Sequence, residues 1–478
     1  MLGLYPLLAI SLSVDTTEVL LAICWPSKTV KMAAGVPRRH ECAIVMTVCD
    51  DARPEFIRLL LPLKKAGYDI YLLDDSSYPA IIPEFIAEQL FHVRRPSCSG
   101  AKAGNLNNWL AMYGNSYKCV AILDSDSIMP VSAVDMLLLA AEHPDNWDVA
   151  IFQSKIGPVP NPHSLFAQIQ GVGARPRARI FERVHNRLGC ILSFGHNQVV
   201  RINALIEVNG FDETLSSEDT VLSLELASKH WRTELVDTWT YECDPETVSA
   251  YIRRSLRWAR QTVELFSRPW YNVPTHLKLL MCRHLLNYTL PLVGFILLCV
   301  SLWSSPSSIE SVWTFLKASI CLVQGYKVYG LALWSSFTIF GIFIILQTIL
   351  AIREGISVRL LLLTWGLGSA PYLFMLFPLA LALAKSAVGM RVRFIPTNSQ
   401  NTQAQDAETT QWIFRILSAC VILAFLWMGV IRRPASLIVG FNAIWLAYLF
   451  FSPVALIIFS IYEARASSKS ILIKEAKL

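Results

Sequence analysis

The sequence predicts an α/β domain with a mostly parallel sheet, fused to an α-helical transmembrane domain. Two observations support this prediction. Short β-rich runs alternate with helical patterns between residues 41 and 280, as they do in α/β domains. Long apolar runs fill much of the remainder, and the whole chain of 478 residues is 54% hydrophobic and only 16% charged. Such a chain is too long for one domain and too apolar for two soluble ones.

Four short runs rich in β-forming residues are expected to build the sheet, and turn residues bound each of them. They are "CAIVMTV" (42–48), "YDIYLL" (68–73), "KCVAILD" (118–124) and "WDVAIF" (147–152). Helical patterns lie between these runs, which favours parallel strands joined by crossover helices. Ligands of such sheets bind at the carboxyl ends of the strands, so the residues that follow each run are candidates for a site.

Acidic residues stand at two of these strand ends. Asp74 and Asp75 follow "YLL", and Asp124 and Asp126 follow "AIL". Two carboxylates one residue apart can hold a hard divalent cation whose remaining positions stay open to phosphate oxygens. Such an ion neutralises the charge that develops on a departing diphosphate. Because a lone D-x-D more often caps a helix from a solvated turn, the prediction of a metal site depends on the motifs around it.

Composition excludes several other classes of protein. The Gly-rich stretch "GVGARP" at 171–176 lacks the third glycine of a dinucleotide fingerprint, which argues against a nicotinamide enzyme. The eleven cysteines include no C-x-x-C pair, so neither a zinc site nor a disulfide scaffold is indicated. Basic residues beside the apolar runs account for the net charge of +6 without a nucleic-acid partner.

Five apolar segments are each long enough to cross about 30 Å of hydrocarbon. They are residues 285–303, 329–352, 360–384, 413–431 and 436–461. Two further segments are open. Residues 311–326 are short and carry Lys317, so they form either a sixth span or an interfacial helix. Residues 2–24 carry Asp15 and Glu18, whose insertion cost roughly cancels the gain from the aliphatic residues, and no basic stretch precedes them as in a cleaved signal peptide.

Basic residues set the expected orientation in the membrane. With a cytosolic middle region and six C-terminal helices, seven fall on the cytosolic side (Lys385, Arg391, Arg393, Arg465, Lys469, Lys474, Lys477) and four on the outer side (Arg353, Arg359, Arg432, Arg433). We therefore expect an integral multi-pass protein of the plasma or inner membrane, in contact with membrane lipids, with its catalytic domain in the cytosol.

Six motifs follow one another in a fixed order. They are "LDDSS" (73–77), "GAKAGNLNNWL" (100–110), "LDSDS" (123–127), "SFGHNQVVR" (193–201), "LSSEDTVLSLEL" (215–226) and "YIRRSLRWARQ" (251–261). With them the chain resembles the membrane-embedded family 2 glycosyltransferases, which include cellulose synthases, hyaluronan synthases and the glucosyltransferases that make periplasmic glucans. The resemblance is close from residue 41 to about 270 and implies a GT-A-type glycosyltransferase domain.

The resemblance also implies a division of the chain. The expected parts are a candidate N-terminal membrane helix and basic linker (1–40), the cytosolic GT-A domain (41–245), amphipathic interfacial helices (246–280), transmembrane helices (281–384), a cytosolic loop and candidate gating loop (385–411), further transmembrane helices (412–462) and a cytosolic tail (463–478). Within the loop, Phe394 to Thr397 match the family's Phe-x-Val-Thr signature only in part, and a plain disordered linker is the alternative.

By the same resemblance, individual residues acquire roles. The donor-binding residues implied are Asp74 or Asp75 at the uridine and the stretch Lys102 to Asn107, with Asn105, against the nucleotide. Asp124 and Asp126 would hold Mg²⁺ or Mn²⁺, with Asp126 as the direct ligand. In the "SSED" motif Asp219, or Glu218 beside it, would be the general base.

The position of Asp219 also follows from local physics. Ser216 or Ser217 is predicted to be the N-cap of the helix "EDTVLSLELASKH", which places Asp219 in the first turn, facing the carboxyl edge of the sheet. Acids are common in that turn simply because they complement the helix dipole, so the other motifs are needed to favour catalysis.

The motif at 251–261 departs from the family pattern Gln-x-x-Arg-Trp. Arg257 and Trp258 match it, whereas Arg254 stands where glutamine is usual. A guanidinium suits a diphosphate and an indole suits a sugar ring. The alternative is that this Arg-rich amphipathic helix only anchors to anionic lipid.

Two further stretches bear on the substrate. "FGHNQVVR" and "YECDPET" (241–247) look nearest to the periplasmic-glucan enzymes, and they suggest His196 and Asn197 as substrate contacts, although a histidine in such a turn is as often structural. The first strand departs from the family, since Cys49, Asp50 and Asp51 replace a Tyr-Asn-Glu-like turn.

The resemblance implies an inverting, metal-dependent transfer from a UDP-sugar, with UDP-glucose the expected donor, to a growing β-glucan that leaves through the membrane helices. One alternative is non-processive transfer to a lipid acceptor. Another, from a different class, is a catalytically silent scaffold or a transporter. Release of UDP would separate the enzymes from the scaffold, and product size would separate the two enzymes.

Overall fold

The computed structural model describes residues 17–26, 28–79, 89–160, 164–304, 351–353, 355–367 and 370–389, with single positions or pairs at 14, between 338 and 349, and at 459. Apart from residue 459, the predicted spans at 311–326, 413–431 and 436–461 lie outside the described residues. So do most of the predicted loop at 385–411 and all of the tail at 463–478.

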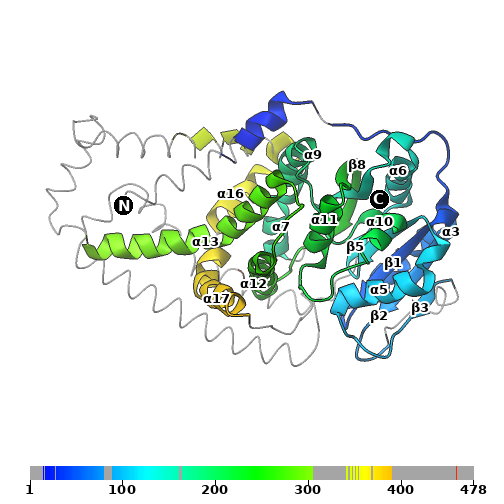
Figure 1. The fold of residues 1–478 in the computed structure, drawn as a ribbon. Helices are drawn as coiled ribbons and strands as arrows, with labels where there is room; N and C mark the ends of the chain where they lie inside the picture. Colours follow the sequence, from blue (N-terminus) through cyan, green and yellow to red (C-terminus); the bar gives the residue numbers. More distant parts are fainter. Residues whose placement is uncertain are drawn as a thin grey trace.

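The described strands form one eight-stranded sheet in the order β3-β2-β1-β4-β7-β6-β8-β5 (Figure 1). The strands are β1 (Cys42–Val48), β2 (Asp69–Asp74), β3 (Phe91–Val93), β4 (Cys119–Asp124), β5 (Ser127–Ile128), β6 (Val149–Pro158), β7 (Gln198–Arg201) and β8 (Arg232–Glu242). The four β-rich runs of the sequence correspond to β1, β2, β4 and β6, so these strand predictions are confirmed.

The sheet is mixed, so the prediction of a mostly parallel sheet holds in part. Strands β3, β2, β1 and β4 are parallel to one another and β6 is parallel to β8, but β7 is antiparallel to both β4 and β6, and β5 is antiparallel to β8. The reason is that β7 starts at the carboxyl edge, where the turn before it is fixed by Asn197 N donating to Ile122 O at 2.7 Å. A strand that leaves this edge must run opposite to β4.

Helices cover both faces of the sheet (Figure 1). One face carries α2 (Pro54–Arg58), α3 (Leu61–Lys65) and α6 (Val131–Glu142), and the other carries α5 (Ala101–Tyr113), α10 (Ile202–Glu207) and α11 (Glu218–Ser228). Alternate residues of β1 belong to the two hydrophobic cores. Ile44 lies in the same cluster as Leu137, and Val45 lies in the same cluster as Trp109. Because both faces are covered, β1 and β4 are apolar along their length, as is usual for central strands.

A second layer of helices comes from two parts of the chain, one between β6 and β7 and the other after β8. It consists of α7 (Leu165–Gly171), α8 (Ala174–Arg177), the π-helix η4 (Ala178–Glu182), α9 (Arg183–Arg187), α12 (Val248–Glu264), α13 (Thr275–Ser304), α16 (Val358–Leu367) and α17 (Ala370–Ala387). Helix α12 packs on α7 and α17 through a cluster that includes Phe166, Tyr251, Met375 and Leu379. This cluster fixes the helix that carries Arg254, Arg257 and Trp258.

Helices are present at three of the predicted membrane spans, and in 329–352 every described position is helical. Residues 285–303 lie within α13, and residues 360–384 lie largely in α16 and α17. Among the described residues, however, no helix is both long enough and apolar enough to cross a membrane. Membrane insertion stays a prediction.

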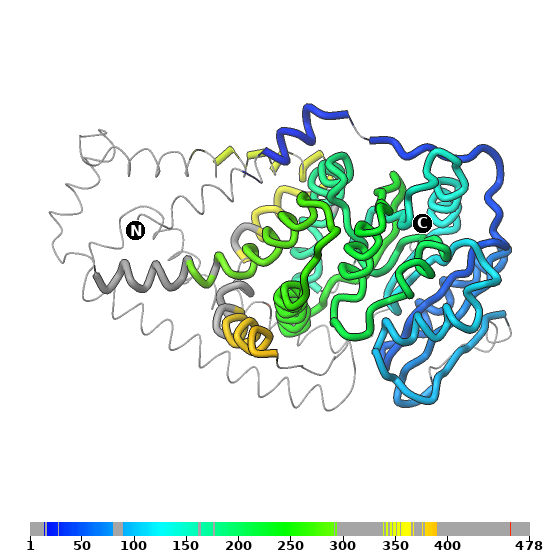
Figure 2. The backbone as a smooth tube through the Cα atoms, in the orientation of Figure 1, coloured from blue at the N-terminus to red at the C-terminus, as the bar shows by residue number. Residues whose placement is uncertain are grey.

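The N-terminal segment runs along one side of the molecule from the helices to β1 (blue in Figure 2). Its Glu18 is buried rather than exposed, and accepts hydrogen bonds from Arg283 Nη2 at 2.9 Å and shares one with His185 Nε2 at 2.9 Å. Further along, Arg39 Nη2 donates to Asp135 Oδ2 at 2.6 Å. The sequence counted Glu18 as an isolated charge, but its partner Arg283 is more than 260 residues away in the chain.

Candidate active site

Lys102 brings three of the predicted motifs together at the carboxyl edge of the sheet. From the first turn of α5, its Nζ donates to Asp124 Oδ1 at 2.6 Å and to Gly195 O at 3.0 Å, and lies 3.7 Å from Glu218 Oε1. Burial alone would lower the pKa of the Lys102 ammonium, but the charges of Asp124 and Glu218 outweigh it and hold that pKa above its usual value. Lys102 is therefore a firmly charged link between "KAGN", "DSD" and "SED".

Two glycines allow α5 to begin at this place. Gly100 has a φ of 71°, and a Cβ there would lie 2.2 Å from Glu213 Oε2. A Cβ on Gly104 would lie 2.1 Å from Ser99 O. Only a residue without a side chain fits either position, so the glycines of the motif set the approach of the helix that carries Lys102.

The D-x-D motif spans the end of β4 and the turn to β5. Asp124 is the last residue of β4, and its pKa is held below the usual value because the charge of Lys102 outweighs the effect of burial. Burial, followed by the negative charges of Glu242 and Asp124, raises the pKa of Asp126 to about 7. The turn thus brings hard oxygen donors together, and Asp126 lies close enough to other carboxylates for their charges to disfavour its ionised form. Within the described ranges, no group of three or more His, Cys, Asp and Glu side chains is already placed to hold a metal.

His196 lies beside this turn as a cation. Its Nε2 is 3.1 Å from Glu242 Oε2, and its Nδ1 is 3.4 Å from Ser127 Oγ. Burial would lower the pKa of His196, but Asp124 and the hydrogen bond to Glu242 raise it to about 9. These contacts are with the protein itself, and contact with an acceptor stays a prediction.

Asn197 occupies the tightest part of the same turn. It is fully buried with a φ of 54°, and its Nδ2 donates to Tyr241 O at 3.3 Å. A residue in this left-handed conformation fixes the chain reversal into β7. The position of Asn197 is thus explained by the turn, and its predicted contact with substrate is untested.

Asp219 stands in the first turn of α11, as predicted. Ser217 is the N-cap residue, but its hydroxyl donates to Asp219 Oδ1 at 3.3 Å instead of capping the helix main chain. The same Oδ1 accepts from Thr220 N at 2.6 Å. The other oxygen, Oδ2, points at Gly195, where an added Cβ would lie 3.1 Å from it. Gly195, with a φ of 82°, packs closely against this carboxylate, and the absence of a Cβ is what leaves room for the contact.

Glu218 is the first residue of α11 and directly precedes Asp219. Burial raises the pKa of Glu218, and the charge of Lys102 opposes that shift. The two acids of "SED" therefore differ: Glu218 faces the ammonium of Lys102, whereas Asp219 faces the turn at Gly195.

The acids after β2 are both engaged. Asp75 receives two hydrogen bonds from Arg95, from Nε at 2.9 Å and from Nη2 at 2.6 Å. Asp74 is fully buried, and its carboxylate meets His92 Nε2 at 2.8 Å and Ser76 N at 2.9 Å. Asp74 therefore holds the turn, and of the two Asp75 is nearer to solvent.

Helix α12 contains Arg254, Arg257 and Trp258, the residues singled out in the last of the six motifs. Arg254 stacks over the indole of Trp258 with 4.8 Å between its Cζ and the ring centroid, and its Nη2 lies 4.0 Å from Asp244 Oδ1. Burial lowers the pKa of Arg257, and the charges of Glu218 and Asp124 oppose that shift. Trp258 remains 39% exposed. The motif thus presents a half-exposed aromatic ring and two guanidinium groups close to the acids.

Comparison with known proteins decides the family. Residues 119–465 match the model described as "Glycosyl transferase family group 2". The chain belongs to this family. The resemblance drawn from the six motifs is thereby confirmed, and the family match together with the mixed sheet supports the GT-A-type fold.

Curated relatives of this family 2 glycosyltransferase are named glucans biosynthesis glucosyltransferase H. The protein from Xylella fastidiosa is 29% identical over 207 residues, which are 40% of this chain and 32% of that protein. The one from Rhodopseudomonas palustris is 28% identical over 243 residues, 46% of this chain and 32% of that protein. The chain thus spans about a third of the length of these relatives.

Solved structures with a similar arrangement are more distant. A mannosyltransferase from Pyrobaculum calidifontis, in complex with GDP-Man and Mn²⁺, is 13% identical, covers 73% of this chain and 98% of its own, and has a TM-score of 0.44. The TarS protein of S. aureus, in complex with UDP-GlcNAc, is 14% identical, covers 75% of this chain and 95% of its own, and has a TM-score of 0.32.

Two further acids of the candidate site, Asp51 and Glu242, lie in stretches that the sequence analysis discussed but received no role from it. Asp51 accepts from Cys49 N at 2.7 Å and from Ser125 Oγ at 2.8 Å, which ties the turn after β1 to the D-x-D turn. Burial raises the pKa of Asp51. Glu242 ends β8 and pairs with His196. The signal for both was their place after a strand, the same signal that selected Asp75 and Asp124.

Asn107 has a structural task that its motif did not predict. Its Nδ2 donates to Phe211 O and to Glu213 Oε1, both at 2.8 Å, and its Oδ1 accepts from Phe211 N at 2.8 Å. Gly210, with a φ of 82°, makes room for this amide, since a Cβ there would lie 2.4 Å from Oδ1. Asn105, two residues earlier in α5, is buried.

We expect Asn107→Ala to lower the free energy of unfolding by about 1–3 kcal/mol, because it leaves buried main-chain groups without partners. Urea unfolding followed by tryptophan fluorescence measures this. Asn108→Ala is the matched control on the same helix, since its amide meets only Met112 Sδ at 3.6 Å, and it should change stability by less than about 0.5 kcal/mol. Equal losses for the two variants would contradict the assignment.

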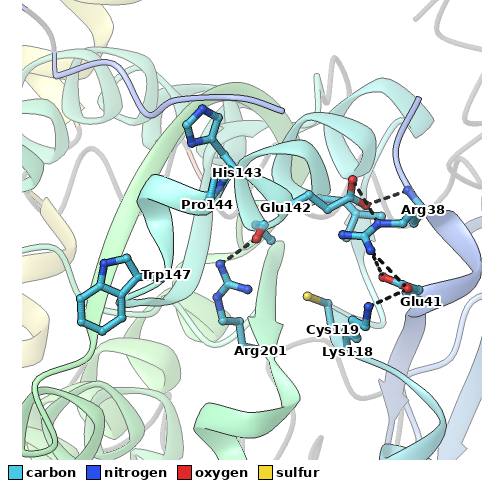
Figure 3. Close-up of a pocket in the computed structure, with 11 residues that line it drawn as sticks. Arg38, Glu41, Lys118, Cys119, Glu142, His143, Pro144, Trp147 and Arg201 are labelled. Carbon is cyan, nitrogen blue, oxygen red and sulfur yellow. Dashed lines mark hydrogen bonds and ion pairs between the residues drawn. The ribbon is translucent and has the colours of Figure 1, made fainter. Parts of the chain in front are cut away.

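A polar pocket of about 210 Å³ lies at the opposite edge of the sheet (Figure 3). Cys119, the first residue of β4, lines it together with Arg201, Glu142 and the exposed Trp147. Arg201 is held there by main-chain carbonyls, with Nε donating to Val149 O at 2.7 Å. None of the predicted site residues lines this pocket, and the acids of the candidate site stand at the other end of β4.

Proposed function

We propose that the protein is an inverting glycosyltransferase that moves a sugar from a UDP-sugar, UDP-glucose in the first place, to a growing β-glucan. One observation carries this proposal: Lys102 contacts Asp124 of the D-x-D turn and lies 3.7 Å from Glu218, next to Asp219. The motifs proposed to bind the donor, to hold the metal at the diphosphate and to supply the base come from separate parts of the chain. They thus meet at the carboxyl edge of the sheet. The similarity to glucans biosynthesis glucosyltransferases favours glucose and a β-glucan.

The D-x-D turn fits a hard divalent cation. Asp124 and Asp126 would hold Mg²⁺ or Mn²⁺, since carboxylate oxygens are the ligands these ions prefer and the charges of Glu242 and Asp124 act on Asp126 in this turn. When bound, the ion would neutralise charge on the diphosphate leaving group. Arg257 and Lys102 add positive charge on the same side of the sheet edge.

In the proposed mechanism Asp219 is the general base. Its Oδ1 is held by Thr220 N, and its Oδ2 lies beside Gly195. An acceptor hydroxyl within hydrogen-bond distance of Oδ2 would give its proton to that oxygen as its own oxygen attacks the anomeric carbon from the side opposite to the diphosphate. Such a displacement inverts the anomeric configuration.

The donor and acceptor would be placed by other side chains. Of the two acids at the end of β2, Asp75 is the proposed uridine contact, because the side chain of Asp74 is fully buried whereas that of Asp75 is 7% exposed. Trp258 would support the acceptor ring, since its indole is half-exposed beside Arg254. We further propose that the catalytic domain faces the cytosol and that the predicted membrane helices give the product its exit.

Donor specificity and product type can be tested together. Purified protein or membranes receive labelled UDP-glucose, UDP-N-acetylglucosamine or UDP-galactose, and UDP release, product size and digestion by linkage-specific hydrolases are measured. We expect UDP release and a β-glucan from UDP-glucose alone. A single sugar on a lipid would favour the lipid transferase, and no UDP release from any donor would favour the silent scaffold.

Trp258→Ala tests the acceptor site by itself. We expect UDP affinity to stay within about twofold of the wild type while the elongation rate falls about tenfold, because the indole contacts the sugar ring and not the nucleotide. Calorimetry with UDP and a primer-extension assay measure the two quantities. Trp231→Ala is the control, since that indole is hydrogen-bonded to Glu207 at 2.8 Å, away from the acids. A large loss of UDP affinity with normal elongation would place the role of Trp258 at the nucleotide instead.

A further inference from the structure

Lys102 lies where the proposed function places the divalent cation and the diphosphate of the sugar donor. Its Nζ is 2.6 Å from Asp124 Oδ1 and 3.7 Å from Glu218 Oε1, and its side chain is only 23% exposed. Thr47 Oγ1 adds a hydrogen bond of 3.4 Å to the same Asp124 oxygen. One ammonium group therefore neutralises both a proposed metal ligand and the acid next to the proposed base.

A divalent cation and this ammonium compete for Asp124. A cation on the Asp124 carboxylate would lie within a few Å of Nζ, and in a half-buried site the repulsion between them is far stronger than in water. The ion can bind well only if the ammonium withdraws from Oδ1. Withdrawal without a new anionic partner leaves this mostly buried charge with Glu218 and the Gly195 carbonyl but without its nearest carboxylate, which is costly.

A nucleoside diphosphate supplies the missing partner. The lysine stem is flexible, and its ammonium can donate to any of several oxygens. Diphosphate oxygens at the carboxyl edge would take the ammonium and at the same time bind the divalent ion. The two ligands then favour each other's binding, and this coupling is reciprocal.

We propose that Lys102 is a resident counter-ion that makes binding of the divalent metal conditional on the nucleotide. This inference rests on the proposed function, since it takes Asp124 as a metal ligand. Its consequence is specific: removal of the ammonium should make the metal bind more tightly when no nucleotide is present. Damage to the site would have the opposite effect.

The test measures Mn²⁺ binding to the whole 478-residue chain by electron paramagnetic resonance, with and without UDP, for wild type, Lys102→Met and Lys102→Arg. In the wild type we expect UDP to tighten Mn²⁺ binding at least tenfold. In Lys102→Met we expect Mn²⁺ alone to bind at least tenfold more tightly than to the wild type, and UDP to improve it less than threefold. Lys102→Arg keeps the positive charge and should keep the dependence on UDP.

Each remaining outcome has a meaning. If Mn²⁺ without UDP binds to Lys102→Met no better than to the wild type, the counter-ion role is overturned while the proposed function stands. If the wild type binds no Mn²⁺ even with UDP, the proposed metal-dependent function is itself contradicted, and with it the role of Lys102. Thermal unfolding controls for folding, and Lys102→Gln, which keeps a polar side chain, carries the same expectation if the methionine variant does not fold.

Discussion

Asp219→Asn should reduce turnover by about a hundredfold to ten-thousandfold, which is the usual contribution of a positioned general base. The substitution keeps the size of the side chain, and the amide oxygen can still accept from Thr220 N, which now donates to Oδ1 at 2.6 Å. What it removes is a proton acceptor at Oδ2, beside Gly195. Initial rates of UDP release with saturating donor and primer give the turnover number.

Binding separates a base from a metal ligand in this experiment. UDP affinity in the presence of Mg²⁺ or Mn²⁺ should stay near the wild-type value, because Asp219 is not expected to contact the ion. Glu225→Gln is the matched control on α11, since that carboxylate meets Arg268 Nη1 at 3.2 Å, and it should keep most of the activity. A near-normal rate for Asp219→Asn would show that "SSED" has been assigned wrongly, and Glu218→Gln would then be the next variant to measure.

Asp126→Ala should abolish measurable turnover and metal-dependent binding of UDP, because it removes the expected direct ligand of the ion. In the structure, burial and then the negative charges of Glu242 and Asp124 raise the pKa of Asp126 to about 7. A bound cation would relieve this repulsion. Calorimetric titration with UDP, with and without Mn²⁺, measures the loss directly.

The control for this variant is Asp237→Ala, a change of the same residue type at a side chain that is 81% exposed. It should leave both UDP binding and turnover unchanged. Because Asp126→Ala also removes an unfavourable charge, its thermal stability without ligands should not fall. Unchanged metal-dependent UDP binding in Asp126→Ala would show that the ion is held elsewhere.

Local sequence determined the elements that carry the chemistry. The apolar run of β4 ends in Asp124 because a strand covered on both faces must leave its first polar residues at its end. The serines and the acids after them predicted the start of α11 and placed Asp219 in its first turn, but they left the N-cap open between Ser216 and Ser217. These features depend on neighbours within a few positions along the chain, and that is the range over which periodicity and capping operate.

Only the tertiary structure decided the partners and the direction of β7. Asp75 is held by Arg95 and Asn107 by Phe211, and His196 is paired with Glu242, a residue 46 positions further along the chain. Each pair joins segments whose spacing in the chain says nothing about their distance in space. The antiparallel β7 has the same origin, since its direction is set by a turn that hydrogen-bonds to β4. The sequence therefore determined which residues stand at the carboxyl edge, and long-range packing determined which charges face one another there.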